Sequence, residues 1–144
     1  MQTLFWAGIV CLSGLAGVIT LYLNFLHGDL KRGAVSTYEI TDAVTVYFPI
    51  EIIIQIILSV LLLTNSDSFG FLLCIPLLMY NMKVLIGKEY RCHALFPRDY
   101  FEKEKIEKIS FSKTVYYGIL LLYTGSRFMG SFLNFITSTP FNIQ

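Results

Sequence analysis

Residues 52–82 read IIIQIILSVLLLTNSDSFGFLLCIPLLMYNM, and Asp67 is the only charged residue among them. Two further runs are similarly apolar: residues 1–26 contain no charged side chain, and residues 114–144 contain only Arg127. A helix needs about 20 mostly apolar residues to cross the roughly 30 Å hydrocarbon core of a bilayer. A helix in a soluble core would show a polar face at helical spacing. The three runs therefore predict an all-α protein that crosses a membrane several times.

The composition agrees with a membrane protein and argues against other classes. Hydrophobic residues make up 55% of the chain and charged residues 15%, whereas a typical soluble domain has about 25% charged residues. The formal net charge of +1 gives no basic excess of the kind that binds nucleic acid. His27 and His93 form no ligand cluster, and the three cysteines are scattered without a CxxC. We therefore expect no metal site and no disulfide framework.

We predict four membrane spans within a single domain of residues 1–144, and the spans are residues 4–26, 46–64, 69–87 and 114–135. The turn-forming residues 65–68 would join the second and third spans as a helical hairpin. An alternative is three spans, with Pro76 marking a re-entrant or interfacial segment. The first run is longer than the roughly 7–15-residue apolar core of a signal peptide and lacks a preceding positive charge. A retained span is therefore favoured over a cleaved signal.

Lysine and arginine are distributed unevenly around these spans. With four spans, the segments 27–45 and 88–113 share one side of the membrane. Together with Lys83, at the adjoining end of the third span, they hold ten of the eleven Lys and Arg residues. The remaining one, Arg127, lies within a span. Because the Lys/Arg-rich side of a membrane protein faces the cytosol, both termini are predicted to be lumenal or extracellular.

Two charged residues lie inside predicted spans, where ionisable groups are candidates for function. At about 1.5 Å per residue, Glu51 is roughly 8 Å into the second span and Arg127 roughly 20 Å from the cytosolic end of the fourth. They differ too much in depth to pair with each other. One interpretation is that each side chain reaches its own interface. The other is that Arg127 reaches Asp67 and holds the hairpin against the fourth span.

Small residues recur at the four-residue spacing that lets helices approach closely. Ser13 with Gly17 lies in the first span, and Ser126 with Gly130 lies in the fourth. Such pairs serve either packing within the bundle or docking of a client helix. In addition, residues 99–113 resemble a short helix with a thin apolar stripe, which fits either a solvated connector or a docking element for a cytosolic partner.

Residues 71–81 read FLLCIPLLMYN. This segment resembles the FLLNxPxLAYN/H signature of the cornichon family, with Cys74 in place of Asn and Met79 in place of Ala. Further positions also match that family's pattern, namely Asp29, Leu30, Glu51, Tyr123 and Arg127. The similarity covers nearly the whole chain. The chain is therefore identified by its sequence as similar to a family of receptors for cargo export from the endoplasmic reticulum.

The resemblance implies a four-span protein with lumenal termini that binds transmembrane cargo in the lipid bilayer and a cargo-binding subunit of the COPII coat in the cytosol. The family's cargo-contact segment corresponds to Leu62, Leu63, Thr64, Asn65 and Ser66. Its coat-binding segment corresponds to Tyr100, Phe101, Glu102, Lys103 and Glu104. In that second segment the aromatic pair remains, but the family's basic residue and terminal Leu are missing, so coat recognition is expected to differ.

The expected function is that of a cargo receptor which resides in the endoplasmic reticulum membrane and cycles to the Golgi in COPII vesicles. The alternative is a stable auxiliary subunit of a channel or transporter complex. Animal relatives of the family serve AMPA-type glutamate receptors in this way, but the first cytosolic segment here is shorter than theirs. The chain has no GxSxG, no HExxH, no Gly-rich phosphate loop and no intramembrane Asp pair. No enzymatic activity, cofactor or nucleic-acid partner is therefore expected.

Overall fold

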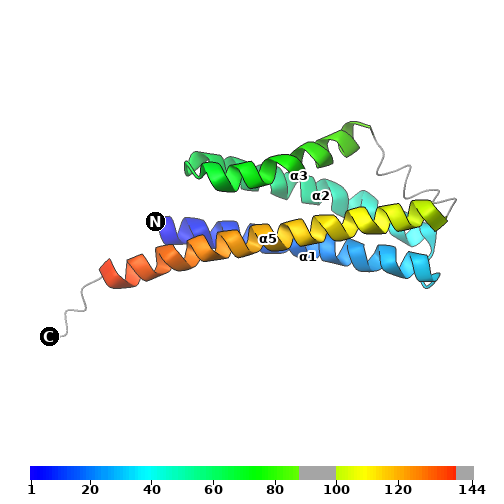
Figure 1. The fold of residues 1–144 in the computed structure, drawn as a ribbon, viewed down its shortest axis with the longest axis horizontal. Helices are drawn as coiled ribbons and strands as arrows, with labels where there is room; N and C mark the ends of the chain where they lie inside the picture. Colours follow the sequence, from blue (N-terminus) through cyan, green and yellow to red (C-terminus); the bar gives the residue numbers. More distant parts are fainter. Residues whose placement is uncertain (88–99, 139–144) are drawn as a thin grey trace.

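The computed structural model describes residues 1–87 and 100–138. These residues form four helices and no strand: α1 (Gln2–Arg32), α2 (Thr37–Thr64), α3 (Ser68–Ile86) and α5 (Tyr100–Ser138) (Figure 1). All four are long and apolar enough to cross a membrane. The predicted all-α fold with four membrane-crossing helices is therefore confirmed, and α3 is one continuous helix that includes Pro76.

Local capping signals separate α1 from α2. Gly33 adopts a left-handed conformation with φ 75°, which a glycine accepts without strain, and its N–H bonds back to α1. Ser36 then begins α2 with a capping box: its hydroxyl accepts from the Glu39 N–H, and the Glu39 carboxylate accepts from the Ser36 N–H. The two helices are consequently joined by a short connection rather than a long loop.

A tight turn joins α2 to α3. Ser66 has a positive φ of 57°, and the Asp67 N–H donates to the Leu62 carbonyl oxygen at 3.2 Å. The polar residues predicted to form a hairpin turn therefore form one. In contrast, residues 100–113 and the predicted fourth span are not separate elements, because α5 continues through both without a break.

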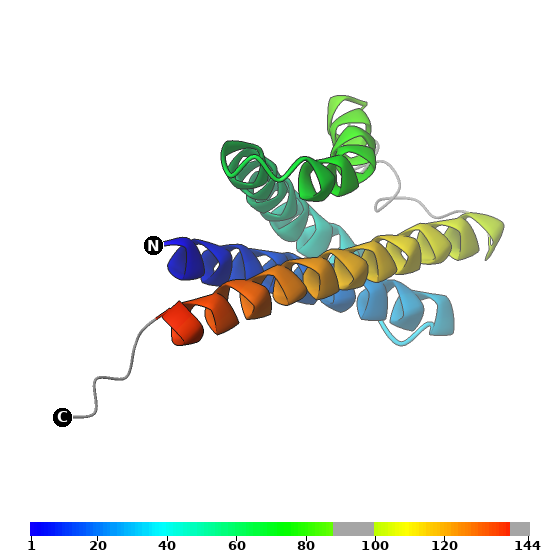
Figure 2. The same cartoon turned by 60° about the vertical axis from the view of Figure 1, so that its left-hand side comes forward.

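The helices form an antiparallel bundle in which α1 and α5 pair along most of their length (Figures 1 and 2). α2 packs on α1, α3 packs on α2, and α3 has a smaller contact with α5. The N-terminus, the α2–α3 turn and the end of α5 lie at one end of the bundle. The α1–α2 connection, the end of α3 and the start of α5 lie at the other.

The distribution of side chains is that of a protein surrounded by lipid. Large apolar residues on every helix are exposed, among them Val18, Ile53, Leu72 and Leu122. Several polar side chains are instead buried, namely Ser13, Thr20, Glu51, Gln55, Ser59, Asp67, Asn81 and Thr124. A soluble monomer rarely exposes so continuous an apolar surface, whereas a bilayer covers it without cost.

The two pairs of small residues have different surroundings. Ser13 is fully buried and lies 3.2 Å from the Thr124 hydroxyl of α5, and a Cβ at Gly17 would lie 3.9 Å from Tyr117. This first pair therefore packs α1 against α5, as one of the two interpretations predicted. Ser126 and Gly130 are exposed, so the second pair faces away from the bundle.

Candidate functional site

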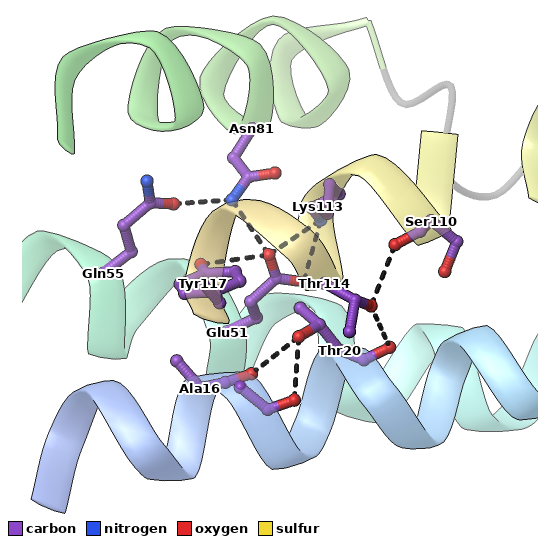
Figure 3. Close-up of polar contacts among 10 residues, drawn as sticks. Ala16, Thr20, Glu51, Gln55, Asn81, Ser110, Lys113, Thr114 and Tyr117 are labelled. Atoms are coloured by element: carbon purple, nitrogen blue, oxygen red, sulfur yellow. Dashed lines mark hydrogen bonds and ion pairs between the residues drawn. The ribbon is translucent and has the colours of Figure 1, made fainter. Parts of the chain in front are cut away.

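A buried carboxylate lies where three helices meet (Figure 3). Glu51 of α2 has no exposed surface, and Lys113 of α5 places its Nζ 2.7 Å from Glu51 Oε1. The Tyr117 hydroxyl donates to the same oxygen at 3.2 Å. From α3, Asn81 Nδ2 donates to Glu51 at 3.1 Å and to Gln55 Oε1 at 2.6 Å. We call these five residues the Glu51 cluster.

The Glu51 cluster is suited to fixing helix positions rather than to chemistry. A buried ion pair loses much of its Coulomb energy to desolvation, and removing one partner leaves an uncompensated charge that costs about 3–5 kcal/mol. The donors on Glu51 come from α3 and α5, so the carboxylate is satisfied only when both helices are in register with α2. The cluster therefore makes the packing of three helices depend on one another.

The amides of the cluster are only partly satisfied. Gln55 Nε2 and Asn81 Oδ1 are buried and have no hydrogen-bond partner among the residues that the structure describes. Unsatisfied polar atoms of this kind lower stability, because each has lost its hydration. Gln55 and Asn81 are therefore better explained as residues that fix the register between α2 and α3 than as residues that raise the free energy of unfolding.

The structure corrects one interpretation of the intramembrane charges. Glu51 does not reach its own interface, because its carboxylate is bound inside the bundle by Lys113. The signal was present in the sequence: Lys113 directly precedes the predicted fourth span, and Glu51 is only roughly 8 Å into the second. Opposite charges at similar depth are possible partners, but which helices are neighbours was not known. Gln55 and Tyr117 carried no signal in the sequence, and Asn81 stood out only as the last residue of the segment 71–81.

A second polar cluster lies nearer the end of the bundle that includes the α2–α3 turn. The Tyr123 hydroxyl of α5 donates to both carboxylate oxygens of Asp67, at 2.8 and 2.9 Å. Arg127 Nη2 lies 3.4 Å from Asp67 Oδ1, and its guanidinium lies 5.6 Å from the centre of the Trp6 ring. The predicted contact between Arg127 and Asp67 is therefore present. We call Asp67, Tyr123 and Arg127 the Asp67 cluster.

Close packing accompanies the Asp67 cluster. A Cβ at Gly70 would lie 3.0 Å from Asp67 Oδ2, 3.1 Å from Leu62 Cδ2 and 3.1 Å from Tyr123 Cε1. Any larger residue at this position would push these groups apart. Gly70 therefore allows the α2–α3 turn to rest directly against α5.

The predicted cargo segment lies beside this cluster and is exposed only in part. Leu62 is fully buried, and Asn65 is half-buried at the end of α2. Leu63 is 57% exposed, and Thr64 and Ser66 are also exposed. Leu62 thus packs inside the bundle, while the other side chains are accessible from outside.

The predicted coat segment is at the start of the longest helix. Residues 100–104 form the first turn and a half of α5. The side chains of Tyr100, Phe101, Glu102, Lys103 and Glu104 lie outside the described part of the structure. Slightly further along α5, Glu107 Oε2 lies 2.9 Å from Lys31 Nζ of α1, which ties the start of α5 to the end of α1.

Within residues 1–87 and 100–138, no group of three or more His, Cys, Asp or Glu side chains could hold a metal ion.

The sequence model of the family described as "Cornichon protein" matches residues 3–124. A curated relative, the "ER-derived vesicles protein ERV15" of Saccharomyces cerevisiae, is 33% identical over 101 residues. That alignment covers 70% of this chain and 68% of the yeast protein. No solved structure matches the chain.

Proposed function

The chain belongs to the cornichon family, and from this membership we propose that it is a receptor for the export of transmembrane proteins from the endoplasmic reticulum. The observation that carries the proposal is the match of the family model to residues 3–124. The name of the yeast relative, a protein of vesicles derived from the endoplasmic reticulum, supports the same role. The chain acts through binding, without a chemical step of its own. It resides in the endoplasmic reticulum membrane and cycles to the Golgi.

The proposed topology places both termini in the lumen. The end of the bundle that includes the α1–α2 connection and the start of α5 contains Lys31, Arg32, Lys83, Lys105, Lys108 and Lys113. Arg127, by contrast, lies toward the end that includes the α2–α3 turn. Because lysine and arginine concentrate on the cytosolic side, the first end faces the cytosol.

Cargo binding is proposed at the lumenal end of α2. Leu63, Thr64 and Ser66 are accessible there, and the outward face of α2 continues as an apolar surface through Val60 and Ile57. An apolar cargo helix gains little hydrophobic energy by leaving lipid, so selectivity depends on close packing and hydrogen bonds. The Asp67 cluster supports this role because it holds the turn that carries the contact residues.

Coat binding is proposed at the opposite, cytosolic end. Residues 100–104 begin α5, and the ion pair between Glu107 and Lys31 anchors the next turn to α1. A coat subunit of COPII that binds the first turn of α5 is thereby linked to cargo at the other end through one continuous helix. The aromatic pair Tyr100 and Phe101 is the proposed contact.

The cargo proposal is tested by substituting the accessible residues. We expect Leu63→Ala with Thr64→Ala to reduce severalfold the transmembrane proteins that co-isolate with the chain from endoplasmic reticulum membranes, measured by quantitative mass spectrometry. Leu4→Ala is the matched control, since Leu4 is also an exposed leucine at the same end of the bundle. Equal co-isolation by the double variant and the control would place the cargo site elsewhere.

A further inference from the structure

A groove of about 590 Å³ opens between α3 and α5 in the part of the chain that the structure describes. α3 lines it with Pro76, Leu77 and Tyr80, and α5 lines it with residues that include Ile109 and Tyr116. Its volume lies within the roughly 300–1,000 Å³ that is typical of small-molecule sites. Most of the lining surface is apolar, so the groove suits one small and mainly apolar ligand.

The walls of the groove are rigid. Pro76 lies within the continuous helix α3, and its ring fixes the backbone angle φ. On the opposite wall, the Tyr116 hydroxyl donates to the Leu73 carbonyl oxygen of α3, which holds the tyrosine ring in place between the two helices. A ligand that is already rigid loses less conformational entropy on binding than a flexible one. The walls therefore favour a rigid molecule over an acyl chain.

One end of the groove offers a hydrogen-bonding group near the membrane boundary. Ser112 lines the groove and lies two residues before the predicted fourth span, whereas Pro76 lies near the middle of the predicted third span. The Ser112 hydroxyl donates to the Lys108 carbonyl oxygen at 2.9 Å, and its oxygen can still accept a hydrogen bond. A neutral hydroxyl on a ligand could donate to Ser112, whatever the net charge of the lysines nearby.

Both walls carry a sequence pattern that has been proposed for sterol contact, in which Leu or Val, Tyr, and Lys or Arg follow one another a few residues apart. The α3 residues that follow it are Leu77, Tyr80 and Lys83. The α5 residues that follow it in reverse order are Lys113, Tyr116 and Leu120. Because α3 and α5 run antiparallel, both patterns have their basic residue toward the same end of the bundle (Figure 1). Such patterns are common in membrane helices, but here both tyrosines line one groove.

We propose that this groove binds one sterol, with its hydroxyl at Ser112 and its fused rings along Tyr80 and Tyr116. A sterol combines a rigid apolar body with a single hydroxyl, which matches rigid apolar walls with one polar end. A cargo helix is too large for the groove. Over the roughly 16 Å from Lys105 to Tyr116, a helix about 10 Å in diameter occupies about 1,200 Å³, which is about twice the volume of the groove.

Photo-crosslinking of the full-length chain in detergent with a photoreactive cholesterol tests the proposal. Mass spectrometry of the labelled peptides should place the label on residues 76–80 and 109–116. Excess unlabelled cholesterol should remove this label, whereas the same excess of phosphatidylcholine should not. Label spread evenly over all helices would overturn the proposal. Equal competition by the two lipids would also overturn it, and would assign the groove to an acyl chain.

A matched pair of variants tests the location of the site. Ile109→Trp should lower labelling roughly tenfold, because its indole fills space that the sterol needs. Phe111→Trp adds an indole two residues away at a position that does not line this groove, so labelling should stay at the wild-type level. Ser112→Ala should weaken cholesterol binding about three- to tenfold, the effect of one hydrogen bond between neutral groups.

Thermal unfolding in detergent shows whether each of these variants is folded. Equal labelling of Ile109→Trp and Phe111→Trp, whether reduced or unchanged, would contradict a sterol in this groove. If Ile109→Trp fails to fold, the position of the label on the wild-type chain and the loss in Ser112→Ala decide the question. Ser112 is exposed, so its hydroxyl can be removed without disturbing the core.

Discussion

Glu51 has a carboxylate that is fully buried but not isolated, because three donors from two other helices bind it. Asn81 is one of these donors and is also the last residue of the FLLCIPLLMYN segment that resembles the family signature. Two features of the sequence, Glu51 and the segment 71–81, are therefore in contact. Their contact explains why this apolar segment ends on a polar residue.

Lys113→Met is expected to lower stability in detergent by about 3–5 kcal/mol, because it leaves the Glu51 carboxylate buried without its cation. Adding Glu51→Gln should recover most of that loss, because no unpaired charge then remains. Thermal unfolding in detergent, followed by circular dichroism, measures both. Lys83→Met is the control, since Lys83 is exposed. A double variant no more stable than Lys113→Met would show that the pair is not the source of the loss.

At the scale of elements, the α2–α3 hairpin is held against α5 by two polar contacts. The Glu51 cluster joins the middle of α2 to α5, and the Asp67 cluster joins the α2–α3 turn to α5. Arg127 was the residue that the sequence singled out for the second contact, and the contact is present at 3.4 Å. The closer donor, however, is Tyr123, at 2.8 and 2.9 Å from the two Asp67 oxygens.

This geometry predicts that Tyr123 contributes more than Arg127 to the free energy of unfolding. Tyr123→Phe should cost about 1.5–3 kcal/mol, because it removes a hydrogen bond to a charged group. Arg127→Gln should cost less than about 1 kcal/mol, because the arginine is 52% exposed and its ion pair is long. Thermal unfolding in detergent compares the two variants directly. A larger loss from Arg127→Gln would assign the contact to the ion pair instead.

The aromatic pair at the start of α5 is predicted to be needed for export. Tyr100→Ala with Phe101→Ala should leave the bundle folded but retain the protein in the endoplasmic reticulum, as seen by fluorescence imaging. The reason is that this aromatic pair is the proposed contact with the coat. Phe111→Ala, which changes an exposed aromatic residue further along the same helix, is the control. Normal export of the double variant would remove this segment as the coat contact.

At the scale of the whole molecule, the apolar runs determine the four helices, whereas the two polar clusters depend on contacts between residues that are distant in the sequence. Four helices, the hairpin turn and the family followed from local patterns, because an apolar run must span a bilayer wherever it packs. The Glu51–Lys113 pair could not be predicted in the same way, because those residues are distant in the sequence and meet only when α2 and α5 are neighbours. Likewise, Leu62 is buried because the turn packs closely against α5, with Leu62 next to Gly70, and this packing cannot be deduced from local sequence.

The described part of the chain is thus a bundle with an apolar exterior and polar contacts inside. Its described lysines, Lys31, Lys83, Lys105, Lys108 and Lys113, belong to the end of α1, the end of α3 and the first half of α5. Such a bundle presents a surface to lipid and to other membrane helices, which is what an export receptor requires. A stable auxiliary subunit would have the same surface but a single client. The two roles therefore differ in how many proteins depend on the chain for export.

The most direct test is a vesicle-budding assay with purified COPII coat and endoplasmic reticulum membranes that contain or lack this chain. Quantitative mass spectrometry of the vesicles measures how much of each transmembrane protein is packaged. We predict that the chain itself enters the vesicles and that several unrelated transmembrane proteins are packaged less efficiently from membranes that lack it. Unchanged packaging of all transmembrane proteins, or loss of only one, would contradict the account of the chain as an export receptor.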